Sequence, residues 1–115
     1  LMRSSAASDV YKRQLLLHGY WHYFDQNGVM KINYWRQKNG QRYYYDADGH
    51  MYQNQGVEIG GYWYYFDNDG IMKANFWRKK DGDRYYYDAN GHLVTNRTMV
   101  INGVTYRFSS SGKVI

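Results

Sequence analysis

The pattern of apolar and polar positions along the chain is that of short β-strands separated by turns. Aromatic runs such as YWYYF at residues 62–66 favour strands, in which alternate side chains point to opposite faces. No segment shows helical periodicity, and the chain has no proline to interrupt a strand. Four of these runs are followed by Asp-x-Asn-Gly or Asp-x-Asp-Gly, and in two of them an aliphatic start comes next, Val29-Met30 and Ile71-Met72. Because Asn-Gly and Asp-Gly are hairpin cues, the pattern predicts β-hairpins that turn at these glycines.

The chain is built from a repeat of 21 residues. One glycine recurs at this spacing, as Gly19, Gly40, Gly61, Gly82 and Gly103. Successive repeats alternate, because Trp21 and Trp63 are replaced by Arg42 and Arg84, so the full period is 42 residues. Such periods are typical of arrays in which each unit packs on its neighbours. The sequence predicts an all-β fold, a β-solenoid of stacked β-hairpins in 21-residue repeats, with units at 19–39, 40–60, 61–81, 82–102 and 103–115.

Alternation within each aromatic run divides its side chains between a core face and an outer face. We expect the core face to hold the positions that are aromatic or His in every repeat: His22, Phe24, Tyr43, Tyr45, Tyr64, Phe66, Tyr85, Tyr87, Tyr106 and Phe108. Residues after the predicted turns should join this core: Met30, Met51, Met72, Leu93 and Val114. The outer face mixes Trp, Tyr and Arg, which is a composition suited to contact with a ligand.

The first 14 residues, LMRSSAASDVYKRQ, share nothing with the repeats. They are similar to a translated sequencing adapter, so Leu1–Gln14 is interpreted as a non-native, disordered segment and residues 15–115 as the module. This interpretation implies that the natural protein continued upstream. Excluding the segment lowers the net charge from +5 to +3, so the attraction to a polyanion is modest.

Composition excludes several classes of function. The chain has no Cys, hence no disulfide or thiolate metal site, and no apolar run long enough for membrane insertion. Basic charge with 20% aromatic residues also occurs in proteins that bind single-stranded nucleic acid. A 21-residue period has no counterpart in those domains and the RNA-recognition signature is absent, so we expect no nucleic acid partner.

Repeated polar residues are better explained by turns than by chemistry. The carboxylates that open the turns, Asp25, Asp46, Asp67 and Asp88, are placed to accept backbone hydrogen bonds, and a catalytic pair copied four times is not expected. A calcium loop at residues 67–70 would need a downstream bidentate Glu, and Arg78 stands there instead. His50 and His92 lack partners for a metal set and are interpreted as surface or strand-edge residues. We therefore expect no catalytic residue, metal or cofactor.

The blocks GYWYYFDNDGIM and GDRYYYDANGHL resemble the cell-wall-binding, or glucan-binding, repeats of glucansucrases, which are related to choline-binding repeats. The resemblance covers Gly19 to Ile115. It implies a non-catalytic module that binds α-glucan or another wall polysaccharide, within a larger secreted enzyme at the bacterial cell surface, such as a glucansucrase. Carried over by position, it implies ring contacts to sugar and polar contacts from a spacer: Trp21, Tyr23, Tyr44, Trp63, Tyr65, Tyr86, Gln37, Lys38, Lys79 and Lys80.

Two alternatives remain beside the glucan hypothesis. One is a choline or teichoic-acid anchor of a wall hydrolase or toxin-like protein, since three rings in such repeats box a quaternary ammonium. Trp35 and Trp77 here lack the preceding Gly of choline-binding repeats, and Arg42 and Arg84 stand where the box needs a ring. A cation at that position would repel choline. The other alternative is a spacer that binds nothing.

Overall fold

A computed structural model describes residues 14–115, and these residues form only strands and turns. The expectation for Leu1–Gln14 lies outside the described residues except for Gln14, which begins the first strand. Among the described residues, no helix is long and apolar enough to cross a membrane. The strands are β1 (Gln14–Leu17), β2 (Tyr20–Tyr23), β3 (Tyr34–Lys38), β4 (Gln41–Tyr45), β5 (Gln55–Ile59), β6 (Tyr62–Phe66), β7 (Phe76–Lys80), β8 (Asp83–Tyr87), β9 (Arg97–Ile101) and β10 (Val104–Phe108).

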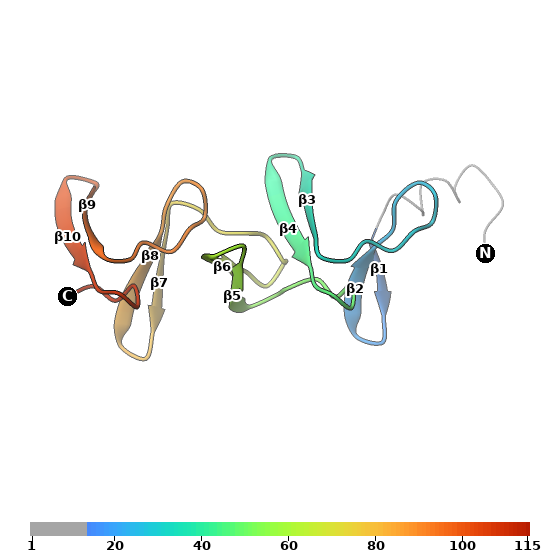
Figure 1. Ribbon diagram of the computed structural model, residues 1–115, viewed down its shortest axis with the longest axis horizontal. Coiled ribbons are helices and arrows are strands. Elements are labelled where there is room, and N and C mark those ends of the chain that lie inside the picture. Colours follow the sequence, from blue (N-terminus) through green and yellow to red (C-terminus); the bar gives the residue numbers. More distant parts are fainter. Residues whose placement is uncertain (1–13) are drawn as a thin grey trace. The chain divides into compact units, whose positions relative to one another are not determined.

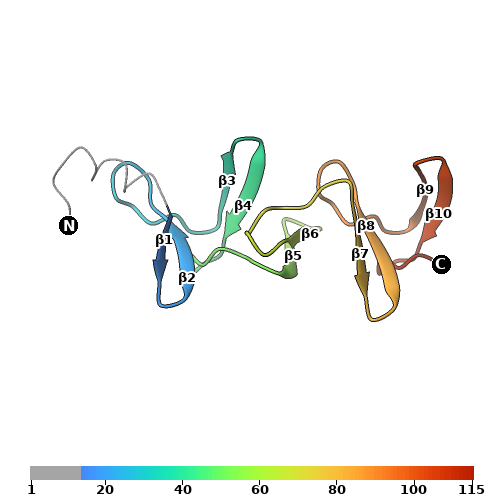
Figure 2. The ribbon, with the colours of Figure 1, turned by 180° about the vertical axis from the view of Figure 1, so that it is seen from behind.

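Consecutive strands pair into antiparallel hairpins, so the predicted all-β fold of hairpin repeats is confirmed. Each described sheet has two strands: β1–β2, β3–β4, β5–β6, β7–β8 and β9–β10 (Figure 1). Figure 2 shows the same pairs from behind. In β3–β4, for example, Lys38 pairs with Gln41 and Tyr34 with Tyr45.

The predicted position of the hairpin turn is wrong. The strands turn at the two residues between them, such as Asn39-Gly40 and Asn102-Gly103. Both residues of each pair have positive φ, 53° and 76° in the first pair, 50° and 81° in the second. This conformation matches the twist of paired strands, and Gly and Asn adopt it most readily. The hairpin cue is therefore valid, but it applies to the glycine that opens each repeat.

The Asp-x-x-Gly segment forms a different turn. Asp25 Oδ1 accepts hydrogen bonds from the backbone N–H groups of Asn27 and Val29 at 2.8 and 3.0 Å. After this turn the chain makes only a single bridge, between Phe24 and Met30, instead of the predicted second strand. The predicted turn role of these carboxylates is confirmed at Asp25, Asp46 and Asp88. Ser109 accepts the corresponding bonds in the last repeat.

The chain divides into two compact units, which are described separately. Unit 1 holds the described residues up to Asn54 together with Asn68–Ile71. Unit 2 holds Gln55–Asp67 and Met72–Ile115. Within unit 1 the hairpins β1–β2 and β3–β4 point in opposite directions, and within unit 2 so do β7–β8 and β9–β10 (Figure 1).

Hairpins within a unit are joined by a repeated contact. The backbone N–H of Leu93 donates to Trp63 O at 2.9 Å, and that of Met51 donates to Trp21 O at 2.9 Å. One repeat's side chain also covers the next repeat's turn glycine: a Cβ built on Gly91 would lie 2.7 Å from Met72 Sδ. Glycine is therefore required at this position by close packing as well as by its φ of 81°.

The core lies on the face predicted from alternation, but it also takes residues from the outer face. Tyr45 and Phe66 are fully buried, and Tyr64, Tyr87 and Phe108 are nearly so, as expected. Tyr86 was predicted to face outward; instead it is buried and packs with Val94, Ile101 and Phe108. Met30, expected in the core, is exposed. Hairpins of two strands are so narrow that neighbouring segments can cover both of their faces.

Candidate functional site

Two tryptophans carry an internal cation on their rings. The guanidinium carbon of Arg42 lies 4.1 Å from the ring centre of Trp35, and Arg84 lies at the same distance from Trp77. Each Arg reaches its Trp across the hairpin, from β4 to β3 and from β8 to β7. Both pairs occupy the same place in their repeats, so the arrangement belongs to the 42-residue period. These faces are already occupied by a cation.

The tyrosines predicted as ligand contacts in the odd repeats are covered in a similar way. The ring of Tyr23 stacks with Tyr34, and Arg36 lies 4.3 Å above it. Forty-two residues later, Tyr65 stacks with Phe76 under Arg78, also at 4.3 Å. Both tyrosines are partly buried. The structure therefore brings them into packing clusters that join consecutive hairpins within a unit.

Tyr44 and Tyr86, the ligand contacts predicted in the even repeats, also belong to packing clusters. Tyr86 is only 6% exposed and lies 4.9 Å from the Trp77 ring, so the accessibility expected for it is wrong. Tyr44 is partly buried against Trp35 and Tyr52. Both rings are covered because residues of neighbouring segments pack on the outer face of the strand. Alternation within a single strand cannot predict such contacts.

Among the aromatic residues predicted as contacts, Trp63 remains the most open. Its side chain is 47% exposed, and it lines a groove of about 470 Å³ in unit 2. Strand β6 supplies Tyr62 and Trp63 to the groove, and the turn and segment after β8 supply polar groups. The lining residues with polar or aromatic side chains are Tyr62, Trp63, Asp88, Asn90, His92, Thr95 and Arg97.

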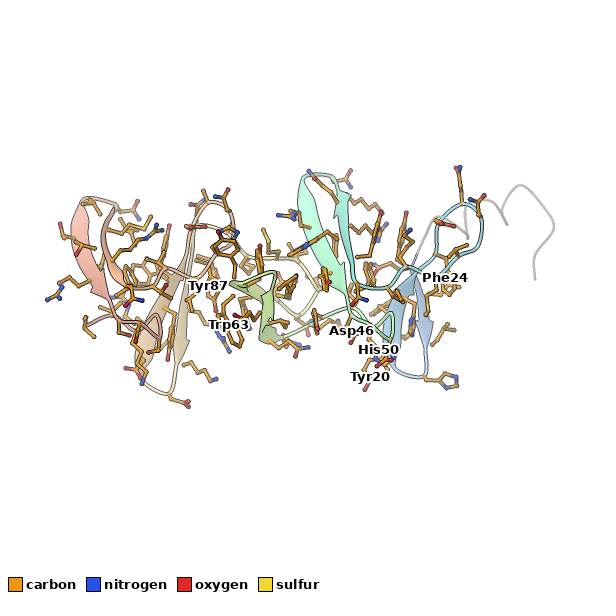
Figure 3. The ribbon with its side chains drawn as sticks, viewed as in Figure 1. Tyr20, Phe24, Asp46, His50, Trp63 and Tyr87 are labelled. Carbon is orange, nitrogen blue, oxygen red and sulfur yellow. The ribbon has the colours of Figure 1, made fainter. Side chains whose placement is uncertain are left out.

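One wall of this groove is a stacked pair that the sequence did not predict. The rings of Tyr62 and His92 lie 3.7 Å apart and 6° from parallel. His92 Nε2 also lies 3.1 Å from the hydroxyl of Tyr64, which is buried. Unit 1 repeats the stack with Tyr20 and His50, 3.8 Å apart (Figure 3). In the sequence, the only indication of this pair is that both the Tyr and the His recur after 42 residues.

The polar side of the groove is an ion pair on a turn. Asp88 Oδ1 accepts hydrogen bonds from the backbone N–H groups of Asn90 and His92 at 2.9 and 3.0 Å. Asp88 Oδ2 lies 3.5 Å from a guanidinium nitrogen of Arg97. The turn therefore fixes the carboxylate, and the carboxylate holds the guanidinium of Arg97 at the groove.

A related groove of about 370 Å³ lies in unit 1 beside Trp21. It is lined by Gln14, Trp21, Met51, Gln53, Asn68 and Asp69. Trp21, Met51 and Gln53 are the counterparts, 42 residues earlier, of Trp63, Leu93 and Thr95. Gln53 Nε2 donates to Asn68 O at 2.9 Å, so part of its polar lining is already hydrogen-bonded within the protein. Trp21 itself is partly buried.

The predicted spacer contacts lie away from both grooves. Gln37, Lys38, Lys79 and Lys80 are exposed and sit near the hairpin ends of β3 and β7. None of them lines the groove beside Trp21 or the groove beside Trp63. Their contact with a ligand stays a prediction.

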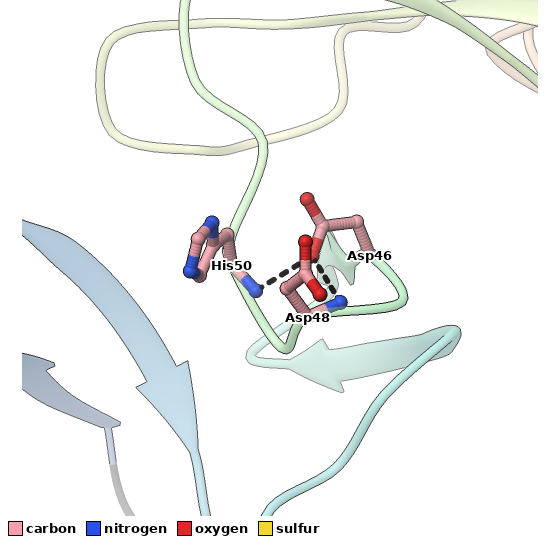
Figure 4. A group of neighbouring side chains, drawn as sticks. All are labelled: Asp46, Asp48 and His50. Carbon is pink, nitrogen blue, oxygen red and sulfur yellow. Dashed lines mark hydrogen bonds between the residues drawn. The ribbon is translucent and has the colours of Figure 1, made fainter.

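Asp46, Asp48 and His50 form a group with ligand-type atoms within 4.8 Å of one another. Asp46 Oδ1 accepts hydrogen bonds from the backbone N–H groups of Asp48 and His50, which closes the turn (Figure 4). The His50 ring stacks on Tyr20. The same turn with Asn90 in place of Asp48 occurs in unit 2, so the group is explained by turn formation.

Two buried residues of unit 1 have shifted pKa values. Burial raises the pKa of Tyr45 to about 12, so its hydroxyl stays protonated and donates to Gln14 Oε1 at 2.6 Å. Burial, together with the neighbouring His50, lowers the pKa of His22 below its usual 6.5. His22 is 7% exposed, and its Nδ1 has no hydrogen-bond partner among the described residues. Both residues serve the packing of unit 1.

Comparison with known proteins identifies the repeats. Residues 57–97 match the family model of the choline-binding repeat, and residues 18–30 and 33–51 match that of the cell wall binding repeat. Together the matches cover more than half of the chain. No curated protein sequence matches the chain.

Solved structures share the fold. The choline-binding domain of CbpL from Streptococcus pneumoniae is 28% identical, with a TM-score of 0.78 over 90% of this chain and 55% of its own. Choline binding protein F from the same organism, solved with a peptidoglycan analogue, is 30% identical, with a TM-score of 0.73 over 89% and 32%. Truncated alternansucrase from Leuconostoc mesenteroides shares the fold at 22% identity, with a TM-score of 0.78 over 89% of this chain and 10% of its own.

The chain thus spans about half of the first of these structures and a third or less of the others. The family matches lie within the part of the chain that forms the hairpin repeats. The chain therefore belongs to the family of choline-binding and cell-wall-binding repeats, which are binding modules.

Proposed function

We propose that this module binds a neutral α-glucan at the bacterial cell surface, as the non-catalytic part of a larger secreted enzyme such as a glucansucrase. Association with the cell wall or surface follows from the family. The observation that carries the choice of glucan over choline is the guanidinium of Arg42 on Trp35 and of Arg84 on Trp77.

A quaternary ammonium needs an open aromatic face, because its attraction to the ring quadrupole falls when another group covers the ring. Arg84 lies 4.1 Å from the centre of Trp77 and 5.4 Å from that of Tyr106, so it covers the two rings that a choline site here would need open. Displacing it would bring like charges together. The filled positions therefore argue against choline sites at these two tryptophans.

A neutral sugar places different demands on a site. It needs an aromatic face for its apolar side and nearby donors and acceptors for its hydroxyls. Trp63 offers such a face, beside the carboxylate of Asp88, the amide of Asn90 and the guanidinium of Arg97. Several weak sites on one chain would add through effective concentration on a polymer that repeats its own sugar units.

The alternative is a choline or teichoic-acid anchor, carried by a wall hydrolase or a toxin-like protein. The choline-binding repeat match over residues 57–97 favours it, and so does the exposed Trp63 within that range. Lys79 and Lys80, exposed at the end of β7, would suit the phosphates of a teichoic acid.

Affinity electrophoresis of the full chain tests these functions. The chain is run in native gels without polymer, with dextran, and with dextran plus millimolar free choline, and it is also applied to a choline-substituted resin. Retardation by dextran that choline leaves unchanged supports the glucan proposal. Retention on the resin that free choline reverses, without retardation by dextran, supports the anchor. A chain that is held by neither matrix overturns both and leaves a spacer.

A further inference from the structure

We propose that the groove beside Trp63 is the principal sugar site of the chain, and that it takes a neutral pyranose, with Trp63 as the stacking platform and the Asp88–Arg97 pair bonding adjacent hydroxyls. This inference rests on the proposed function and deepens it, because it assigns the site and its polar contacts. The two 42-residue periods then differ in function, because the groove beside Trp63 binds sugar more strongly than the groove beside Trp21.

The ring of Trp63 is available as a platform, whereas the rings of Trp35 and Trp77 are covered. Trp35 and Trp77 each carry an Arg side chain, while no cation lies over Trp63 in the described part of the chain. With 47% of its surface exposed, Trp63 can offer a ring face to the apolar side of a sugar. The volume of the groove, about 470 Å³, lies in the range of small-ligand sites.

The wall of the groove is held in place before any ligand arrives. Tyr62 is stacked on His92, and His92 is fixed in turn by its contact with the buried hydroxyl of Tyr64. The backbone N–H of Leu93 donates to Trp63 O, which ties the strand carrying the platform to the segment carrying the polar groups. Such preorganisation reduces the entropy lost on binding.

The Asp88–Arg97 pair offers an acceptor and donors side by side. Asp88 Oδ1 is used by the turn, whereas Oδ2 meets only one guanidinium nitrogen, at 3.5 Å. A guanidinium has five N–H donors, and the Arg97 side chain is half exposed, so donors remain for a ligand. Because the pair is neutral overall, it suits adjacent hydroxyl groups, one of which donates and the other accepts.

The groove beside Trp21 lacks these features. Its tryptophan is partly buried, and its Gln53 is bonded to Asn68. In the sequence, Gln55 stands 42 residues before Arg97, so the guanidinium is absent from the earlier period. Its lining also includes the carboxylate of Asp69. We therefore expect weaker sugar binding beside Trp21.

Binding of isomaltotriose to the full chain, followed by tryptophan fluorescence and by proton NMR, tests the assignment. Trp63→Ala and Arg97→Gln are compared with Trp21→Ala, which removes the tryptophan of the weaker groove, and with the matched control Arg107→Gln. Arg107 is an exposed Arg of β10 outside this groove. We expect both groove variants to lose about tenfold in affinity, equivalent to about 1.4 kcal/mol. Arg107→Gln should change the affinity by less than threefold, and so should Trp21→Ala, because the groove beside Trp21 is expected to bind sugar more weakly. Far-UV circular dichroism checks that all four variants are folded.

Two outcomes separate the assignment from the function on which it rests. If both groove variants bind as the wild type does, while the chain is still retarded by dextran, the site assignment fails and the function stands. If the wild type binds neither isomaltotriose nor dextran, the proposed function fails as well. Dextran sulfate is run in parallel: an Arg97→Gln variant that loses only the sulfated polymer would overturn the neutral-sugar assignment in favour of an anion site.

Discussion

The guanidinium of Arg84 lies against two aromatic rings, 4.1 Å from the centre of Trp77 and 5.4 Å from the centre of Tyr106. The two ring centres are 4.8 Å apart at an angle of 65°. A cation of the protein thus covers ring faces that would have to be open to bind an external cation. In unit 1, Arg42 lies over one ring, that of Trp35, at the same distance of 4.1 Å. In this member of a choline-binding repeat family, two tryptophans are thus covered by arginines of the same chain.

Removing Arg84 should create a choline site. In Arg84→Ala the faces of Trp77 and Tyr106 lose their guanidinium, and a quaternary ammonium could replace it with a Kd in the millimolar range. Isothermal titration with choline chloride measures this, with tetramethylammonium as a second probe and Arg107→Ala as the control. Equal and negligible heats for Arg84→Ala and wild type would show that the rings do not form a cage.

The conflict of Arg42 and Arg84 with choline could be predicted from the sequence, whereas the groove beside Trp63 could not. Arg42 and Arg84 replace a ring at a fixed place in the repeat, so their conflict with choline is visible in the alignment of repeats. The groove beside Trp63 depends on His92 and Arg97, which lie about thirty residues further along the chain. Periodicity within one strand contains no information on which later turn covers it.

Substituting the turn glycine Gly91 should destabilise the protein more than substituting the hairpin glycine Gly82. Both have similar φ values, 81° and 84°, so alanine meets the same backbone strain of about 1 kcal/mol at each. Only at Gly91 would the new Cβ also meet Met72, at 2.7 Å from Sδ, whereas nothing lies within 4 Å of a Cβ at Gly82. We expect an additional loss of about 1–3 kcal/mol in Gly91→Ala.

Chemical denaturation of the two alanine variants gives the difference directly. The double variant Met72→Ala with Gly91→Ala should recover part of the loss, since the side chain that the Cβ meets is then absent. Equal free energies of unfolding for Gly82→Ala and Gly91→Ala would mean that Met72 moves aside without cost. The contact between Met72 and Gly91 would then not stabilise the packing of one repeat on the next.

The two kinds of turn also explain where prediction of the fold succeeded and where it failed. The repeat, the strands and the all-β class follow from aromatic runs and fixed glycine spacing. The hairpin turn was placed at Gly28 and its counterparts, because Asn-Gly and Asp-Gly occur there too. In the structure only the glycine of that turn has positive φ, while Asn39 and Gly40 both do. Two similar dipeptides in one repeat cannot be ranked without knowing which strands pair.

Trp63 and Trp77 should differ in their effect on stability. Trp77 packs against the buried cluster of Tyr86, Val94, Ile101 and Phe108, so Trp77→Ala removes core contacts and should cost about 3 kcal/mol. Trp63 is 47% exposed, and Trp63→Ala should cost about 1 kcal/mol or less. Midpoints of urea denaturation compare the two variants. A larger loss in Trp63→Ala would assign that ring to packing and remove it as a binding platform.

Acid should weaken unit 1 through His22. Burial, reinforced by the neighbouring His50, lowers the pKa of this residue in the folded protein, although Asp46 acts in the opposite direction. At a pH between the lowered pKa and 6.5, the unfolded chain binds more protons than the folded one. The stability contributed by neutral His22 is therefore complete above about pH 6.5 and is lost as the pH falls below it. Thermal unfolding followed between pH 7.5 and pH 5 should show a falling midpoint in the wild type.

His22→Tyr is the matched variant, because Tyr64 occupies the same position 42 residues later and its hydroxyl lies 3.1 Å from His92 Nε2. A tyrosine at position 22 can make the same contact with His50, so the substitution replaces an unpartnered Nδ1 with a hydrogen-bonded hydroxyl. The midpoint of the variant should then fall less with pH than that of the wild type. Parallel curves for the two proteins would assign the acid sensitivity to other groups.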